Sequence, residues 1–273
     1  MKAAVFGAHG FIGGHLSRRL QEQGWDVLAL SRGDERWRGR RLGHVFYCAG
    51  LTADFRTRPF ETIDAHISFA AEVLRAADFD SFLYCSSTRV YAGCERAVET
   101  ARLSVDPADP GDLYNLSKLM GEAACLALPR PEVRVARLSN VFGDDPTSDN
   151  FLNSVLCAAV RDGRVVLQSD PGSSKDYVAV EDAAEAMVRI SLHGGERLYN
   201  VAAGRNTSHG EILASLRAAT GCRIETPAGE TPQVFAAIAV ERLKALGGWA
   251  PADVLDRLPA LIKGLQGLQS NTP

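Results

Sequence analysis

The sequence predicts an α/β fold built on a doubly wound parallel sheet. Short apolar runs alternate with amphipathic helical segments, and the first run, AAVF, is followed directly by the glycine-rich stretch GAHGFIGG. After about residue 143 the alternation becomes less regular. Because parallel strands need crossover connections, which helices usually supply, we expect a Rossmann-type domain over residues 1–143. A smaller lobe over residues 144–273 should be interleaved with the last sheet strands.

The expected elements follow from hydrophobic period and turn residues. Strands are expected over residues 2–6, 25–32, 44–50, 79–87, 133–143, 165–168, 176–180 and 198–203. Helices are expected over residues 11–24, 59–78, 114–128, 150–163, 181–194 and 209–221, with two short terminal helices within 240–248 and 252–265. The connection over residues 31–44 is too short for a helix and a strand. The sheet should therefore lack the usual third strand, and the connection should be irregular.

Composition describes an ordinary globular chain of 273 residues, 46% hydrophobic and 23% charged, with a net charge of -3. That balance gives no general attraction to nucleic acid or to an anionic membrane. The basic stretch SRGDERWRGRR fits either a solvated loop or a polyanion site. Six scattered cysteines favour reduced thiols in the cytoplasm over a disulfide framework or a metal site. No leader-like segment or membrane-length apolar run occurs, so a cytoplasmic location is expected.

The glycine-rich stretch lies where a strand passes into a helix, which is where a dinucleotide pyrophosphate binds in such folds. Glycine there lets backbone amides approach the phosphates. Glycine also serves any tight strand-to-helix connection, so the pattern alone leaves a purely structural role open. We expect residues 1–143 to bind a dinucleotide and residues 144–273 a substrate. The cofactor-binding residues expected in the turn are Gly7, His9, Gly10, Phe11, Ile12 and Gly13.

The second expected strand ends in LALSR, at the place where a carboxylate would accept hydrogen bonds from an adenosine ribose. Ser31 and Arg32 stand there instead. A guanidinium cannot accept these bonds but pairs well with a 2′-phosphate, so NADP is favoured and NAD remains an alternative. A merely exposed structural arginine would give the same pattern.

Tyr114 and Lys118 are one helical turn apart in DLYNLSKLMGE, so their side chains share a helix face. A phenol with its usual pKa near 10 is a poor acid-base group at neutral pH unless a nearby ammonium stabilises its anion. Lys118 supplies that charge. Ser87, at the end of the strand FLYCSS, is placed to hydrogen-bond a substrate carbonyl or hydroxyl.

These motifs make the chain resemble the extended short-chain dehydrogenase/reductase superfamily, in its NAD(P)-dependent epimerase/dehydratase family. The resemblance rests on GAHGFIG, SSTRVYAG, YNLSK, RLSNVFG, KDYVAVEDAAEA and ERLKALGGWAP. It implies a catalytic triad of Ser87, Tyr114 and Lys118, with Lys118 also binding the nicotinamide ribose. It further implies that Asn140 lies near the substrate, that the substrate is linked to a nucleotide, and that helices 60–77 and 112–127 form a homodimer. Three residues at the end of the third expected strand should also contact the cofactor: Ala49, Gly50 and Leu51.

The chain departs from this family at two further places. Dehydratases of the family carry an Asp-Glu pair after the catalytic serine or threonine, whereas this chain has Thr88 and Arg89. Elimination of water is therefore not expected, and these two residues become candidates for substrate binding. Family members bind a nucleotide diphosphate with an arginine that is replaced here near Gly229–Glu230–Thr231. Lys175 or Arg205 would have to bind the diphosphate in its place.

The stretch CAGLTADFRTRPFE should lie at the carboxyl end of the sheet, where open α/β folds bind ligands. A salt-bridged loop would explain it equally well. If the stretch is functional, Arg56 is the residue expected to bind an anionic substrate group.

The leading hypothesis is an NADP-preferring oxidoreductase or epimerase for a nucleotide-sugar-like substrate, most simply a ketoreductase with Tyr114 as general acid or base. One alternative is an NADPH-dependent reductase of a smaller carbonyl compound. The other is a non-catalytic NADP-binding sensor.

Overall fold

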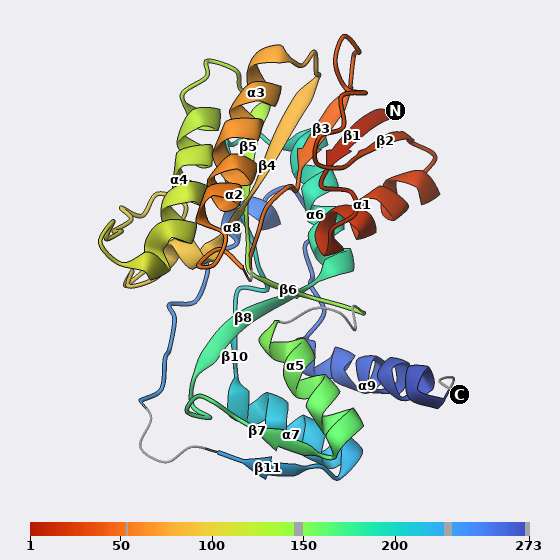
Figure 1. Cartoon of the computed structure of the whole chain (residues 1–273), viewed down its shortest axis with the longest axis vertical. Coiled ribbons are helices and arrows are strands. Elements are labelled where there is room, and N and C mark those ends of the chain that lie inside the picture. Colours follow the sequence, from red (N-terminus) through yellow and green to blue (C-terminus); the bar gives the residue numbers. More distant parts are fainter. Residues whose placement is uncertain (53, 145–149, 227–230, 271–273) are drawn as a thin grey trace.

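A six-stranded parallel sheet forms the centre of the upper part of the molecule (Figure 1). The structure is a computed structural model that describes residues 1–52, 54–144, 150–226 and 231–270. The strand order is β2-β1-β3-β4-β5-β9, and every pair is parallel. The strands are β1 (Lys2–Phe6), β2 (Asp26–Leu30), β3 (His44–Tyr47), β4 (Ser81–Ser87), β5 (Val133–Leu138) and β9 (Leu198–Val201).

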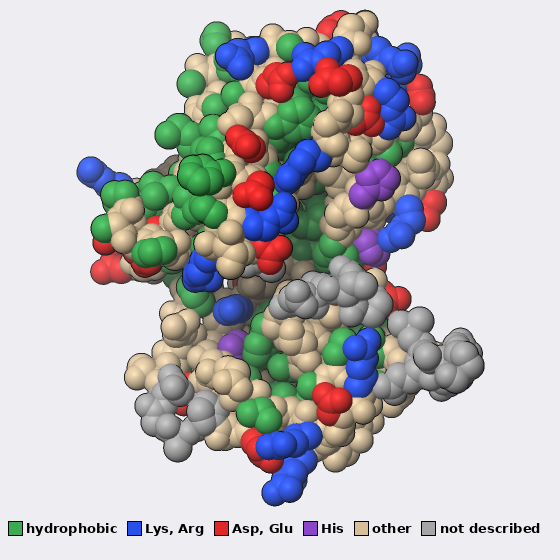
Figure 2. Space-filling model, in the orientation of Figure 1, with side chains coloured by type: hydrophobic (Ala, Val, Ile, Leu, Met, Phe, Trp, Pro, Cys, Tyr) green, Lys and Arg blue, Asp and Glu red, His purple; other side chains and the backbone are tan. Residues whose placement is uncertain are grey.

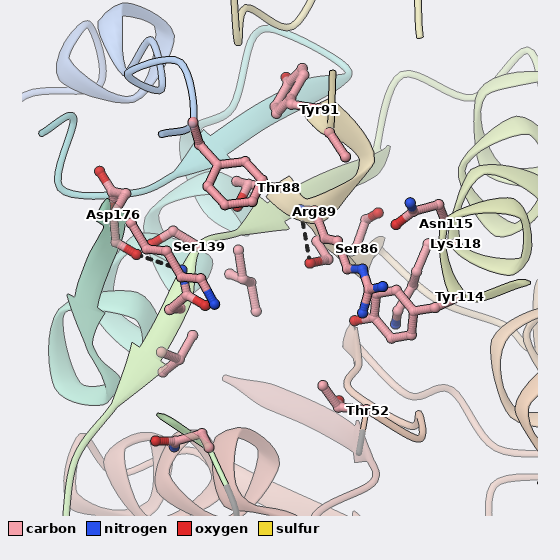
Figure 3. A pocket seen from close by; sticks show the side chains of 18 of the residues that line it. Thr52, Ser86, Thr88, Arg89, Tyr91, Tyr114, Asn115, Lys118, Ser139 and Asp176 are labelled. Carbon is pink, nitrogen blue, oxygen red and sulfur yellow. Dashed lines mark hydrogen bonds between the residues drawn. The ribbon is translucent and has the colours of Figure 1, made fainter. Parts of the chain in front are cut away.

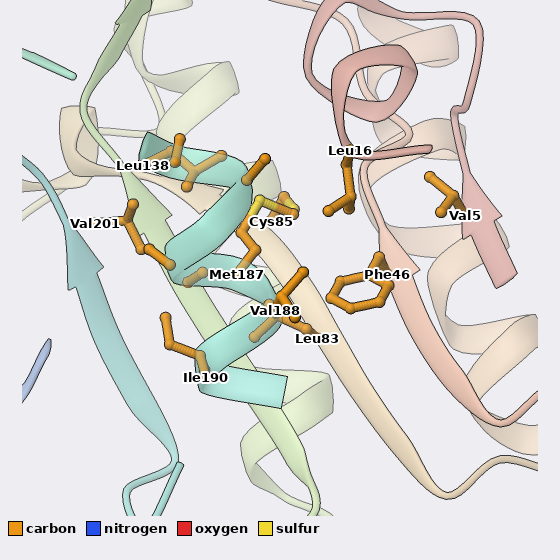
Figure 4. Close-up of a cluster of buried hydrophobic side chains, with 14 of the residues drawn as sticks. Val5, Leu16, Phe46, Leu83, Cys85, Leu138, Met187, Val188, Ile190 and Val201 are labelled. Atoms are coloured by element: carbon orange, nitrogen blue, oxygen red, sulfur yellow. The ribbon is translucent and has the colours of Figure 1, made fainter. Parts of the chain in front are cut away.

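Helices cover both faces of this sheet, as the α/β prediction requires. One face carries α1 (Phe11–Glu22) and α6 (Val180–His193), and Figure 4 shows side chains of these helices packed on those of the strands. The other face carries α3 (Phe69–Ala76) and α4 (Leu113–Leu126). Successive residues of β1 alternate between the two cores, as the period of a strand dictates. The doubly wound parallel sheet is confirmed.

The absence of the usual third strand is also confirmed. Residues 31–43, all of which are described, contain turns and a single bridge from Arg41 to Asp78 instead of a strand. Trp37 lies in this loop, is fully buried, and packs edge-on against Phe6 at a ring-centroid distance of 6.0 Å. Arg36 pairs with Asp34 and donates to the carbonyl oxygen of Ala29 at 2.8 Å. The loop therefore supplies its own core residue and ion pair.

The chain leaves the main sheet at Ser139 and builds the lower part of the molecule (Figure 1). Its elements form a three-stranded sheet, β10-β8-β6, and a two-stranded sheet, β11-β7, with helices packed around a separate apolar cluster. The strands are β6 (Asn140–Phe142), β7 (Arg164–Val166), β8 (Ser174–Ala179), β10 (Asn206–Ser208) and β11 (Arg223–Glu225). The helices are α5 (Phe151–Cys157), a π turn η4 (Ala158–Asp162), α7 (His209–Thr220) and α9 (Val254–Ser270). The short helix α8 (Glu241–Lys244) instead places Leu243 in the core of the main sheet.

Several expected elements need correction. The strand expected over 133–143 is two strands, β5 and β6, which belong to different sheets. The helix expected over 59–78 is α2 (Pro59–Ile63), a π turn η1 (Asp64–Ser68) and α3. The last helix, α9, has 17 residues and is not short. The three-residue strands β10 and β11 were not expected, because so short a segment carries no readable period.

Candidate active site

A cavity of about 1010 Å³ lies between the carboxyl ends of the main-sheet strands and the lower sheet. Figure 3 shows its lining side chains, and Figure 2 shows the hollow between the two parts of the molecule, with lysine and arginine side chains on both sides. Thirteen of the residues singled out from the sequence line it: Gly10, Phe11, Ile12, Gly13, Gly50, Arg56, Ser87, Thr88, Arg89, Tyr114, Lys118, Asn140 and Lys175. Gly7, His9, Ser31, Arg32, Ala49 and Leu51 do not belong to the lining.

The glycine turn has the geometry of a phosphate cradle. Gly7 has a positive φ of 81°, and a Cβ there would lie 2.8 Å from the backbone of Cys48 and Ala49. A Cβ on Gly13 would lie 2.2 Å from the Gly7 carbonyl oxygen. A Cβ on Gly10 meets only that same oxygen, at 3.4 Å, on a residue that lines the cavity. No side chain caps α1, so its first N–H groups remain available for an anion. These features fit a dinucleotide pyrophosphate.

Ser87 ends β4 and caps the short 3₁₀ helix η2 (Thr88–Tyr91). Its Oγ accepts a hydrogen bond from the Arg89 N–H at 3.2 Å. Since the hydroxyl acts there as acceptor, its own proton can be donated to a ligand oxygen. Below this strand end, the Glu122 carboxylate accepts from Ser86 Oγ and from Arg137 Nε, the latter at 2.9 Å. The Arg137–Glu122 pair is almost completely buried and fixes the strand end against α4.

Tyr114 and Lys118 lie one turn apart on α4, and both line the cavity. The Lys118 ammonium lies 5.9 Å from the centre of the Tyr114 ring and donates to the Cys85 carbonyl oxygen at 2.9 Å. One hydrogen bond leaves two of its three N–H groups for other partners. In the part of the chain that the structure describes, no carboxylate forms an ion pair with Lys118. Its positive charge is therefore available to the phenol.

His66 ties the loop after β3 to α4. It is fully buried in the π turn, where its Nε2 accepts from the Leu51 N–H at 3.2 Å. The Nδ1 must then carry the proton and donate it to Ser117 Oγ, 2.8 Å away. Burial, together with the charge of Lys118, lowers the pKa of His66 to about 2, so the ring is neutral. Sequence reasoning missed this residue, because a histidine inside an amphipathic helix carries no signal of its distant partners.

Three cationic side chains face the cavity from separate segments. Arg56 comes from the loop before α2, Arg89 from η2, and Lys175 from β8. Partial burial and the neighbouring Arg56 lower the pKa of Arg89, and partial burial and Arg89 lower the pKa of Lys175. Arg205, the other residue considered against a diphosphate, pairs with Asp253. Gly229 and Glu230, where the family arginine is replaced, lie outside the described residues.

Sequence reasoning also missed the acidic residues of the lining, Asp109, Asp112 and Asp176. Asp109 accepts from the Gly111 N–H, and Asp112 from Asn115 Nδ2 and the Asp106 N–H. Asp176 is buried and accepts from the backbone N–H groups of residues 203–205. All three carboxylates are thus engaged in holding loops.

The carboxyl end of β2, beside the glycine turn, carries exposed side chains. Ser31 and Arg32 are exposed at the end of β2. Asp34 lies nearby, and the Arg36 guanidinium hydrogen-bonds its carboxylate and lowers its pKa. The carboxylate that follows β2 is therefore already engaged by an arginine.

Three further observations bear on the sequence expectations. The Sγ atoms of Cys48 and Cys85 lie 3.5 Å apart on the cavity wall, and all six cysteines are free thiols. Among the described residues, no group of three or more His, Cys, Asp or Glu side chains is arranged to hold a metal ion. No helix in the described ranges has the length and apolar character needed to cross a membrane.

Comparison with known proteins gives consistent results. The model of the NAD dependent epimerase/dehydratase family matches residues 3–202. A putative UDP-glucose 4-epimerase of Methanocaldococcus jannaschii is 25% identical over 90% of this chain and 92% of its own. The solved structure of MoeE5 in complex with UDP-glucose and NAD superposes with a TM-score of 0.83 at 22% identity, covering 100% of both chains. RMD from Pseudomonas aeruginosa, complexed with NADPH, has a TM-score of 0.79 at 24% identity, covering 98% of this chain and 99% of its own.

Proposed function

The chain belongs to the NAD dependent epimerase/dehydratase family, and on that premise we propose that it is an NADP-preferring oxidoreductase or epimerase of a nucleotide sugar. This proposal rests on one observation: the glycine turn after β1 and the side chains of Ser87, Tyr114 and Lys118 line the same cavity. A bound nicotinamide supplies or accepts the hydride. The relatives named after UDP-glucose and solved with it support a nucleotide-sugar substrate.

In this proposal Tyr114 moves the proton of the reacting hydroxyl or carbonyl. Lys118 stabilises the phenolate by its unpaired charge and can bind a cofactor ribose through its remaining N–H groups. Ser87 donates its free proton to the same substrate oxygen. Neutral His66 hydrogen-bonds both the Leu51 backbone and Ser117 of α4, and so fixes the position of the loop beside the cofactor relative to the catalytic helix.

Elimination of water is disfavoured for this site. Thr88 and Arg89 stand where the acid and base would be, and the described carboxylates of the lining already hold loops. Hydride transfer with proton movement through Tyr114 needs neither group, so we favour ketoreduction or epimerisation.

The proposed NADP preference rests on Arg32. It is exposed beside the turn with no ion-pair partner in the described part of the chain, whereas Asp34 is held by Arg36. A 2′-phosphate would find a free guanidinium there, and a ribose diol would find no free carboxylate on Asp34.

We also propose a homodimer through the α2 and α4 side of the molecule. Phe60, Met120 and Leu126 are exposed on these helices at 77%, 57% and 39%, and Figure 2 shows hydrophobic side chains gathered on that side. Light scattering should give twice the chain mass, and Met120→Lys should give the mass of one chain.

The central test is Tyr114→Phe, which deletes only the phenolic hydroxyl. We expect turnover of a nucleotide sugar to fall by about 10² to 10⁴ while NADPH binding stays nearly unchanged. Lys118→Ala should impair both. The matched control is Tyr199→Phe, since Tyr199 is buried in β9, does not line the cavity, and accepts a hydrogen bond from the Glu196 N–H. Full turnover in the Tyr114 variant would exclude the mechanism.

A further inference from the structure

We propose that the sugar of the substrate carries a carboxylate, as in a hexuronic acid, and that Arg89, assisted by Arg56, recognises it. This inference rests on the proposed function and names the class of nucleotide sugar. It is carried by the position of two arginines beside the tyrosine of the candidate catalytic triad.

The two guanidinium groups share one aromatic ring. The Cζ atoms of Arg56 and Arg89 lie 4.5 Å and 5.0 Å from the centre of the Phe55 ring, which is itself buried. The Phe55 ring lies 5.5 Å from the Tyr114 ring, and the Arg89 Cζ also lies 5.5 Å from the Tyr114 ring centre. Figure 3 shows Arg89 beside Tyr114. Phe55 therefore fixes two positive charges next to the reacting group.

Neither arginine has an anionic partner among the described residues. Several arginines elsewhere in the chain do form ion pairs, such as Arg36 with Asp34 and Arg137 with Glu122. Arg89 instead donates to the Gly111 carbonyl oxygen at 3.2 Å, which uses one of its five N–H groups. Two like charges facing one cavity disfavour each other, and the pKa of Arg89 is lowered by its partial burial and, after that, by Arg56. A bound carboxylate would remove the repulsion and fit the planar guanidinium.

The carboxylate of a sugar fits this place better than the diphosphate. In a nucleotide sugar the diphosphate is attached at C1, whereas the carboxylate of a hexuronic acid is attached at C5, on the other side of the ring oxygen. Arg89 lies beside Tyr114, where the sugar must react, and Lys175 approaches from β8. Arg89 is therefore assigned to the sugar, and Lys175, which the sequence offered as a replacement for the family arginine, to the diphosphate.

The test compares matched ligands by calorimetry on the NADPH-loaded protein. UDP-glucuronic acid and UDP-glucose differ only in the carboxylate, and free glucuronate and glucose form the same pair without the nucleotide. In each pair that binds, we expect the acid to bind about 10- to 100-fold more tightly than the neutral sugar, which is the contribution of a charge-assisted hydrogen bond. Arg89→Gln should abolish the difference, whereas Lys175→Gln should weaken both UDP-sugars alike. Arg75→Gln, on the outer surface of α3, is the control and should change nothing.

The outcomes separate this inference from the proposed function. Equal affinity for acid and neutral sugar in both pairs overturns the carboxylate assignment, even if both UDP-sugars bind. Equal weakening of UDP-glucose and UDP-glucuronic acid by Arg89→Gln assigns Arg89 to the diphosphate and also overturns it. An Arg89-dependent preference confined to free glucuronate, with no binding of UDP-sugars, supports the carboxylate site and rejects the nucleotide-sugar substrate.

Discussion

Two glycines of the turn after β1 should fail in different ways when each is replaced by alanine. A Cβ on Gly13 would lie 2.2 Å from the Gly7 carbonyl oxygen and 2.8 Å from its carbon, and neither backbone atom can rotate away. A Cβ on Gly10 would lie 3.4 Å from the same oxygen and would otherwise project into free space beside the cavity. Gly13→Ala therefore perturbs the fold, and Gly10→Ala perturbs the ligand.

The magnitudes follow from these contacts. Overpacking costs about 1–3 kcal/mol, and a backbone clash this close belongs at the upper end. Alanine has a higher helix propensity than glycine, which stabilises α1 by about 1 kcal/mol. The free energy of unfolding of Gly13→Ala should therefore be about 2 kcal/mol below that of the unaltered protein. Gly10 is the N-cap with a φ of -81°, which alanine adopts without strain, so stability should change little. Its methyl group should instead cost one amide contact to phosphate, or about tenfold or more in NADPH affinity.

The assay is urea unfolding of the protein without ligand, paired with calorimetric titration of NADPH. Gly267→Ala is the control: this glycine is in α9 with nothing near its added Cβ, so the variant should gain stability slightly and bind NADPH normally. Equal loss of stability in the Gly10 and Gly13 variants would refute the reasoning. So would unchanged NADPH affinity in the Gly10 variant.

Four further predictions follow from other parts of the molecule. Arg32→Asp should weaken NADPH binding by about 1–2 kcal/mol, and stronger NADH than NADPH binding by the unaltered protein in calorimetry would contradict the proposed cofactor preference. Trp37→Ala empties a fully buried site and should cost about 3–5 kcal/mol in chemical unfolding; a loss below about 1 kcal/mol would mean that the loop over 31–43 does not depend on it. Glu122→Gln leaves the buried Arg137 without its countercharge and should cost about 3 kcal/mol, measured in the same way, with wild-type stability as the disproving result. The folded chain holds the pKa of His66 at about 2, below its value of about 6.5 in the unfolded chain, so between these two pH values only the unfolded state binds the proton. The free energy of unfolding should therefore fall as the pH drops below about 6.5, by up to about 1.4 kcal/mol per pH unit. A His66→Gln variant whose unfolding free energy keeps the same pH dependence would reject this role of His66.

Local patterns predicted much of the fold. The glycine turn, the one-turn spacing of Tyr114 and Lys118, and the short connection after β2 each lie within a few residues, so the parallel sheet and its missing strand could be inferred directly. The division of 133–143 into β5 and β6 could not, because it depends on β8, a later strand that pairs with Asn140–Phe142.

The candidate site shows the same division between local and distant information. Residues at strand ends and in motifs were found, and Arg56, Arg89 and Lys175 do line one cavity. Phe55 and His66 were missed, because their importance comes from partners on α4 and η2 that only the folded chain brings close. Asp176 was missed because its role is to accept from the backbone of residues 203–205.

The missing third strand makes β2 an edge of the sheet. Such an edge exposes a row of outward backbone groups that can template pairing with another chain and so start aggregation. In this protein the Arg36 guanidinium caps the Ala29 carbonyl oxygen, and Asp34 holds the guanidinium in place. The loop over 31–43 thus blocks part of the edge that a third strand would have covered, and we expect this to hinder edge-to-edge pairing of folded chains.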